Sequence, residues 1–249
     1  EGHPVTLWRI AGATNSIYLL GSIHLLREQD HPLPGVIDKA YDDADVIVME
    51  IDMDDVDPVY TQAAFNRAGV LQDGTTLQDL RGEEAFTAAS EAAAAIDIPL
   101  DMLAKSEPWL AAITVELMLL YRIGFDPALG VEMTMTQRAA ADGKPIEGLE
   151  TIDEQLAFLD GLPIDAQREM LLQVLSEGAA MSESIGELIE AWHHGDTATL
   201  EDALLSSAVG LDELKEVLVN SRNRRWAETI STWLDDQQDY LIVVGALHL

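Results

Sequence analysis

Short apolar runs alternate along the chain with longer amphipathic stretches, and this alternation is the main structural signal. Five of the runs are rich in β-branched and aromatic residues and are bounded by turn formers, which predicts strands. The predicted strands cover residues 5–10, 16–23, 45–51, 144–149 and 239–247. The first two are separated by Ala-Gly-Ala-Thr-Asn, which suits a hairpin loop. The others are continuous apolar runs, as in strands buried on both faces.

The stretches between the predicted strands have helical periodicity. Residues 32–44 open with a proline and place four apolar residues on one face, which predicts a crossover helix between the second and third strands. Two longer helical blocks cover about residues 59–142 and 151–236. We therefore expect an α/β protein with a central, mostly parallel β-sheet flanked by helices. We expect one domain over residues 1–249, with the helical insertions capping the carboxyl ends of the strands.

The composition limits the classes of function. The 249 residues are 48% hydrophobic, enough for a sizeable core, and no apolar run approaches the roughly 20 residues of a membrane-spanning helix. Fourteen basic and 45 acidic residues give a net charge of −31, which disfavours binding to nucleic acid or to anionic membrane surfaces. The absence of cysteine excludes disulfides, thiolate metal sites and cysteine nucleophiles.

Polar residues that could carry chemistry lie at the carboxyl ends of the predicted strands. The second strand leads to His24, the third to Glu50, the fourth to Glu147 and Glu150, and the last to His248. Because ligands of open α/β sheets gather at the carboxyl ends of the strands, we expect these side chains to share one edge of the sheet.

Two imidazoles with carboxylates, and no thiolate, are a donor set that suits a divalent metal ion. Such an ion can activate a bound water for hydrolysis at neutral pH. Each histidine also follows a glycine by three residues, Gly21 before His24 and Gly245 before His248, and a glycine lets a backbone or a ligand approach closely. Hydrogen-bonded structural histidines at strand ends are common, so the spacing alone leaves both interpretations open.

Arginines are few, yet Arg222, Arg224 and Arg225 occur together in one predicted helix. Arg222 and Arg225 share a helical face and could stabilise an oxyanion or orient a carboxylate, although ordinary surface ion pairs also fit this spacing. His193 and His194 precede Gly195 at an expected helix end, where cations are favoured without any metal. No nucleophile elbow, Walker A loop or dinucleotide-binding fingerprint occurs in the sequence.

Several of these segments together resemble the TraB/PrgY/GumN family, and most of all its bacterial GumN-like branch. They are LWRI, IYLLGSIHLL, VIVMEID, LGVEMTMTQRAAADGKPIEGLET, RNRRWAETI and YLIVVGALHL. The family is related to the Tiki metalloproteases and more distantly to erythromycin esterases and ChaN-like haem-binding proteins. Family members usually continue past the second Gly-x-x-His with a further helix and strand, whereas this sequence stops at Leu249.

The resemblance implies an extracytoplasmic, metal-dependent hydrolase, such as a peptidase, using manganese, cobalt or zinc. By position it implies metal ligation by His24, Glu50 and His248 and catalytic roles for Glu50, Glu150 and Arg222. It implies binding roles for Gly21 and Gly245.

The expected partner is a peptide or another small extracytoplasmic substrate, without nucleic acid and without membrane insertion. A sequence that begins at Glu1 fits a processed, periplasmic protein. The alternatives are a non-catalytic protein that binds a peptide or a haem-like ligand, and a structural helper in polysaccharide export. The substrate and the oligomeric state are not predicted.

Overall fold

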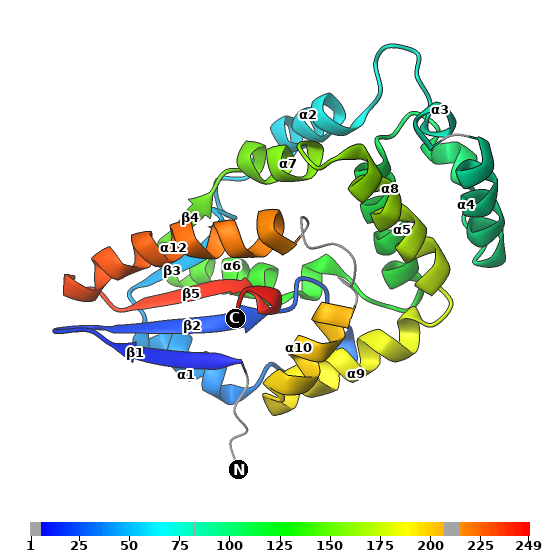
Figure 1. Ribbon diagram of the computed structural model, residues 1–249. Coiled ribbons are helices and arrows are strands. Elements are labelled where there is room, and N and C mark those ends of the chain that lie inside the picture. The colour runs from blue at the N-terminus through cyan, green and yellow to red at the C-terminus, as the bar shows by residue number, and fades with distance from the viewer. Residues whose placement is uncertain (1–5, 82, 207–214) are drawn as a thin grey trace. The chain divides into compact units, whose positions relative to one another are not determined.

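The computed structural model describes residues 6–81, 83–206 and 215–249. The described part contains a five-stranded sheet in the order β1-β2-β5-β3-β4 (Figure 1). The strands are β1 (Leu7–Ala11), β2 (Ser16–Ser22), β3 (Val46–Ile51), β4 (Ile146–Glu150) and β5 (Tyr240–Gly245). All five predicted strands are therefore confirmed within a residue or two at most ends; Val5, in the first prediction, lies outside the described residues.

The pairing directions agree with the predicted α/β class. β1 and β2 form an antiparallel hairpin, whereas β2–β5, β5–β3 and β3–β4 are parallel. The last strand of the chain, β5, lies in the centre between β2 and β3. All six of its residues are buried, as expected for a continuous apolar run.

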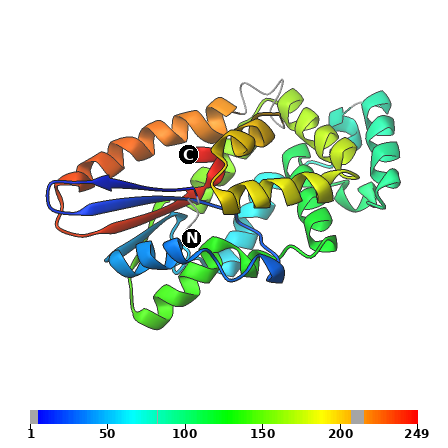
Figure 2. The same cartoon turned by 90° about the horizontal axis from the view of Figure 1, so that it is seen from below.

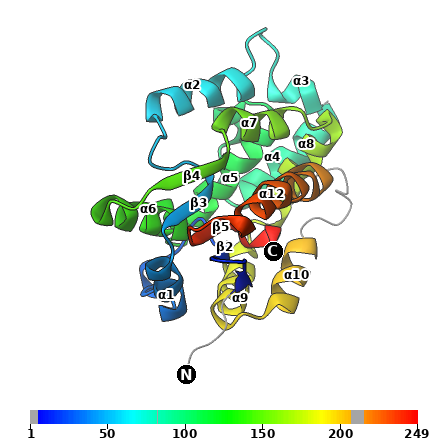
Figure 3. The ribbon, with the colours of Figure 1, turned by 90° about the vertical axis from the view of Figure 1, so that its left-hand side faces the viewer.

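The two faces of the sheet are covered by different helices (Figures 2 and 3). On one face, Trp226 of α12 (Ser221–Thr232) packs in a core with Val46 and Val48 of β3 and Ile242 of β5. On the other face lie α1 (Gly35–Asp43), the predicted crossover helix, and α6 (Val131–Asp142). Successive side chains along β3 point to opposite faces, and Val46, Ile47, Val48 and Met49 are all buried, so both faces of this strand are covered.

The remaining helices fall within the two predicted helical blocks. The first block contains α2 (Pro58–Gly69), α3 (Leu77–Arg81), α4 (Glu83–Ala95), α5 (Pro108–Arg122) and α6. The second contains α7 (Ile152–Asp160), α8 (Ile164–Glu177), α9 (Met181–His194), α10 (Thr197–Ser206), a π-helix (Glu216–Asn220) and α12. Residue 82 and residues 207–214 of these blocks lie outside the described residues.

The chain divides into two compact units. Unit 1 comprises Glu1–Val56, Phe125–Thr151 and Ile185–Leu249 and contains the sheet. Unit 2 comprises Asp57–Gly124 and Ile152–Ser184 and is helical, with a core in which Ala111 and Val115 of α5 pack with Leu171 and Leu175 of α8. The single domain and the cap over the strand ends stay predictions. No helix among the described residues combines the length and apolarity that crossing a bilayer requires.

Candidate active site

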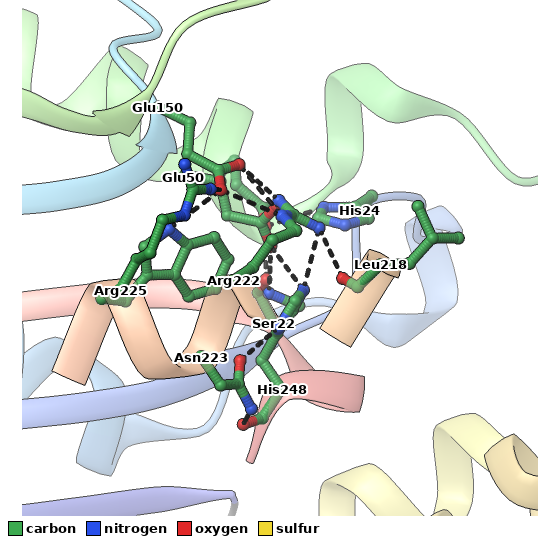
Figure 4. A network of polar contacts seen from close by, with 12 residues as sticks. Ser22, His24, Glu50, Glu150, Leu218, Arg222, Asn223, Arg225 and His248 are labelled. Carbon is green, nitrogen blue, oxygen red and sulfur yellow. Dashed lines mark hydrogen bonds and ion pairs between the residues drawn. The ribbon is translucent and has the colours of Figure 1, made fainter. Parts of the chain in front are cut away.

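Three neighbouring parallel strands bring the candidate residues together at their carboxyl ends. β5 pairs with β2 on one side and with β3 on the other, and Ser22 lies opposite Gly245 in the register. The segment leading to His24 therefore leaves the sheet beside the segment leading to His248, and Glu50 lies near the end of the next strand. Figure 4 shows these side chains directed toward one another, all within unit 1.

The first corner fixes His24 against Glu132, an acidic residue in the first turn of α6. His24 Nδ1 lies 2.8 Å from Glu132 Oε1, and Ser22 Oγ donates to the same oxygen. Since a carboxylate accepts, Nδ1 carries a proton. The charge of Glu132 raises the pKa of His24 to about 9, although partial loss of water around the ring opposes this shift. The imidazole is therefore a cation at neutral pH.

The backbone of this corner is held by close packing before α6. The Val131 N–H donates to the Ile23 carbonyl at 3.1 Å. A Cβ at Gly130 would lie 2.0 Å from the His24 carbonyl oxygen, so no side chain can be accommodated there. Glu132 is thereby placed beside the His24 ring, and it joins two segments more than a hundred residues apart.

The second corner holds His248 as a neutral ring. His248 Nδ1 lies 2.7 Å from Asn223 Oδ1, and the Asn223 amide donates to the His248 carbonyl at 2.9 Å, so the proton is assigned to Nδ1. Its ring also packs on Trp226, with 4.5 Å between centroids. The side chain is 6% exposed, and burial lowers the pKa of His248 to about 4.

Glu50 lies between the two corners. Its Oε1 accepts the Gly245 N–H at 2.8 Å, and its Oε2 accepts from Arg222 Nη2 at 2.6 Å. Burial alone would raise the pKa of Glu50, but Arg222 and the two histidines outweigh burial and hold this pKa below its usual value. The carboxylate is therefore charged at neutral pH.

Arg222 joins the site from the first turn of α12. Its Nε and Nη2 bind Glu150 at 2.8–3.1 Å, while Nη1 donates to the Leu218 carbonyl at 3.0 Å. Nη1 also lies 3.2 Å from His248 Nε2. Leu218 belongs to the π-helix that runs directly into α12, and π-helical turns are frequent at functional sites.

Glu150 is the fourth-strand glutamate that faces this network, whereas Glu147 is exposed. The Glu150 side chain is 1% exposed and also accepts from Arg225 Nη2 at 2.6 Å and Trp226 Nε1 at 3.1 Å. With four donor groups around it, Glu150 is a buried anchor for the two arginines.

Gly21 and Gly245 each allow a close approach, but to different groups. A Cβ on Gly21 would lie 2.8 Å from Thr6 Oγ1 and 3.1 Å from Ala246 Cα, so this glycine permits close packing between strand and backbone. A Cβ on Gly245 would lie 3.3 Å from His24 Nε2 and 3.4 Å from Glu50 Oε1. Gly245 therefore keeps the space between these two polar atoms accessible.

The structure thus brings together His24, Glu50, Glu150, Arg222, Gly245 and His248, while Gly21 packs behind them. Sequence reasoning assigned no role to Ser22, Glu132 or Asn223. An acidic residue in a first helical turn also occurs simply to complement the helix dipole, so nothing in the sequence distinguished Glu132. Asn223 follows Arg222 directly, and this pair belonged to the pattern that carried the family resemblance.

The donors of the predicted metal site match a divalent ion in type but not in arrangement. Anchoring of each Nδ1 by a side chain is typical of metal-binding histidines. However, His248 Nε2 and Glu50 Oε2 both face Arg222. Within the described ranges, no group of three or more histidine, aspartate or glutamate side chains is placed to hold a metal ion. As these side chains stand, the set does not fit a metal, and the metal stays a prediction.

A cavity of about 410 Å³ borders this site at His248 and Asn223. Its other described lining residues come from Thr6 and the start of β1, from α10, from Lys215 and the π-helix, and from residues 246–249. This volume is within the range of small-molecule sites in proteins.

Comparisons with known proteins agree with the resemblance found in the sequence. The chain is 23% identical over 232 residues to the uncharacterized protein YbaP of Escherichia coli (strain K12), and equally to YbaP of Shigella flexneri. Each alignment covers 93% of this chain and 83% of the relative. No solved structure matches the chain. The TraB/PrgY/gumN family matches residues 6–249, and the chain therefore belongs to that family.

Proposed function

We propose that this chain is a hydrolase in which His24 and Glu50 are the catalytic pair. The observation that carries this proposal is the facing of a protonated imidazole and a charged carboxylate across Gly245. Titratable groups with shifted pKa values that lie together at the carboxyl ends of the strands of an α/β sheet are typical of catalytic centres.

In the proposed reaction Glu50, which is charged at neutral pH, acts as the general base, and His24, which is protonated, acts as the general acid. A water proton would pass to Glu50 Oε1 while the water oxygen attacks a substrate carbonyl carbon. The bond to the leaving group then breaks, and the leaving nitrogen or oxygen takes the proton from His24 Nε2. Solvent exchange returns both residues to their starting states. The 58% exposure of the His24 side chain makes its proton accessible to a substrate.

Four other residues hold the side chains of the site in place: Arg222, Glu150, Glu132 and Asn223. Arg222 fixes Glu50, Glu132 fixes His24, and Asn223 fixes His248. Because Glu150 binds only positioning groups among the described residues, we assign it and Arg222 to positioning rather than to chemistry. The cavity beside His248 offers room for part of a substrate.

The substrate that we propose is a peptide or another small amide or ester. The support is chemical: the pair would hydrolyse a neutral carbonyl group, and an acidic surface disfavours polyanions. An extracytoplasmic location stays a prediction from the family resemblance. The divalent cofactor that the resemblance also implies has no part in the proposed reaction.

The test is incubation of the full chain with a panel of unstructured peptides and simple esters in water enriched in oxygen-18, followed by mass spectrometry. We expect cleavage with incorporation of the label. Glu50→Gln and His24→Gln should each lower the rate by roughly 100-fold or more, as expected when a general base or acid is lost. Matched controls are Glu147→Gln, at an exposed position of β4, and His194→Gln, at the end of α9, which should leave the rate unchanged.

Cleavage that persists in both Glu50→Gln and His24→Gln would contradict the assignment of the pair. A substrate that binds without any change in mass across the panel would contradict the hydrolase itself and favour the non-catalytic binding protein. Thermal unfolding of each variant separates a lost reaction from a lost fold.

A further inference from the structure

Every N–H group of Arg222 has an acceptor among the described residues. A guanidinium carries five N–H groups in a fixed plane. The Nε–H lies between the two Glu150 oxygens, the Nη2 protons face Glu150 and Glu50, and the Nη1 protons face the Leu218 carbonyl and His248 Nε2. The side chain is 9% exposed. Arg222 is therefore a fixed, fully bonded cation at the centre of the site.

This cation uses lone pairs that a metal ion would need. His248 Nε2 is 3.2 Å from Nη1, and its Nδ1 is already protonated toward Asn223. Glu50 Oε2 is 2.6 Å from Nη2, and Glu50 Oε1 accepts a backbone N–H. Each of these two predicted ligands therefore directs at least one lone pair at a protein donor.

The charges around Arg222 also balance without a metal. Arg222 and Arg225 are two cations, and Glu50 and Glu150, the carboxylates that they bind, are two anions. A divalent ion added to this network would leave two positive charges without compensation in a largely buried place, and such burial is costly.

We propose that the Arg222 guanidinium is the resident cation of this site and takes the place of a divalent metal ion. It follows that removing the guanidinium leaves Glu50 and Glu150 facing each other with His248 beside them, as a new divalent site. This inference concerns the same side chains as the proposed hydrolase. Its test measures metal content and stability instead of turnover, so the two proposals can fail separately.

The experiment uses the full chain, purified without chelator, in four forms: wild type, Arg222→Met, Arg222→Lys and Arg224→Met. Elemental analysis gives the metal content, and titration calorimetry with MnCl₂ and ZnCl₂ gives the affinity. Arg224 is the matched control, because it lies on the same helix, is 64% exposed, and pairs with Glu216 away from the site.

We expect wild type, Arg222→Lys and Arg224→Met to carry no stoichiometric metal. Arg222→Met should bind one ion per chain roughly 100-fold more tightly than wild type, because a nearby unit charge no longer opposes the ion. Its melting temperature should rise when Mn²⁺ or Zn²⁺ is added.

Wild-type protein that holds one divalent ion per chain, or that loses stability on chelation, would overturn the inference without any need for the variants. A folded Arg222→Met protein that gains no affinity would overturn it as well. If Arg222→Met does not fold even with metal, the same metal measurements on Arg222→Gln, together with the metal content of wild type, test the inference instead.

Discussion

His24 and His248 follow matching glycines on neighbouring strands, but their rings lie in different surroundings. The His24 side chain is largely exposed and contacts the Glu132 carboxylate, so its ring is a cation at neutral pH. The His248 side chain is buried and is hydrogen-bonded to the Asn223 amide, so its ring is neutral at neutral pH. The difference arises from Glu132 of α6 and Asn223 of α12, which are distant in sequence from the histidines. A repeated sequence pattern therefore fixes where two side chains lie, while the elements packed against them decide what each can do.

The largest effect that this comparison predicts is a loss of stability in acid caused by His248. Its folded pKa, about 4, lies below the ordinary value of 6.5, so the stabilisation is present above pH 6.5 and is lost as the pH falls toward 4. The contribution is on the order of 3 kcal/mol. Urea unfolding between pH 4 and 7 should show a smaller pH dependence for His248→Asn than for wild type. A dependence unchanged in His248→Asn but reduced in the control His194→Asn would refute this origin.

A methyl group on the second glycine should separate the proposed catalytic pair, His24 and Glu50, while leaving the fold intact. Gly245 has φ −51° and ψ 139°, which alanine adopts without strain. The added carbon would press on His24 Nε2 and Glu50 Oε1, and such displacements of reacting groups cost roughly tenfold to 100-fold in rate. For Gly245→Ala we therefore expect a clear loss of rate in the hydrolysis assay and little change in the melting temperature.

The same substitution at the first glycine should have the opposite outcome. In Gly21→Ala, the methyl would meet Thr6 Oγ1 and the Ala246 backbone, and the backbone cannot move aside cheaply. We expect a loss of about 1–3 kcal/mol in the free energy of unfolding, as for other overpacked positions. The rate per folded molecule should stay near that of wild type; a Gly21→Ala protein that is fully stable but inactive would show that both glycines face the site.

The smallest predicted effect is a loss of stability at alkaline pH that is caused by His24. Because its folded pKa is raised, its stabilisation is present below pH 6.5 and is lost as the pH rises through about 9. Solvent screens this exposed pair, so the contribution is at most about 1 kcal/mol. Unfolding at pH 6, 8 and 10 should show this decline in wild type and not in Glu132→Gln; equal declines in both proteins would assign it to other groups.

Much of the fold could be predicted because each apolar run is continuous and is bounded by turn formers. The five strands, the hairpin and the crossover helix at residues 32–44 are local features of the sequence. The order of strands was not predicted, since the position of β5 between β2 and β3 depends on packing over the whole chain. The same limit applies to the site. His24, Glu50 and His248 follow from strand ends, but Glu132 lies on a helix whose position only tertiary structure reveals.

The roles that we propose for two residues differ from the roles that the family resemblance implied. Arg222 and Glu150 lie where the family pattern implied, yet their bonds to each other occupy both groups. Spacing can bring a cation and a carboxylate into one region, but it does not show that they neutralise one another. Whether they pair depends on how deeply Arg222 is buried in the folded protein, and the spacing of residues in the sequence does not reveal this.

The central position of β5 has a consequence during protein synthesis. Residues 240–245 leave the ribosome after β2 and β3 have already been made, and they must insert between them to complete the sheet. Pairings of such long sequence separation form slowly. Until then, Gly245 does not lie between His24 and Glu50, so under the proposed function we expect the nascent chain to be inactive until β5 enters the sheet.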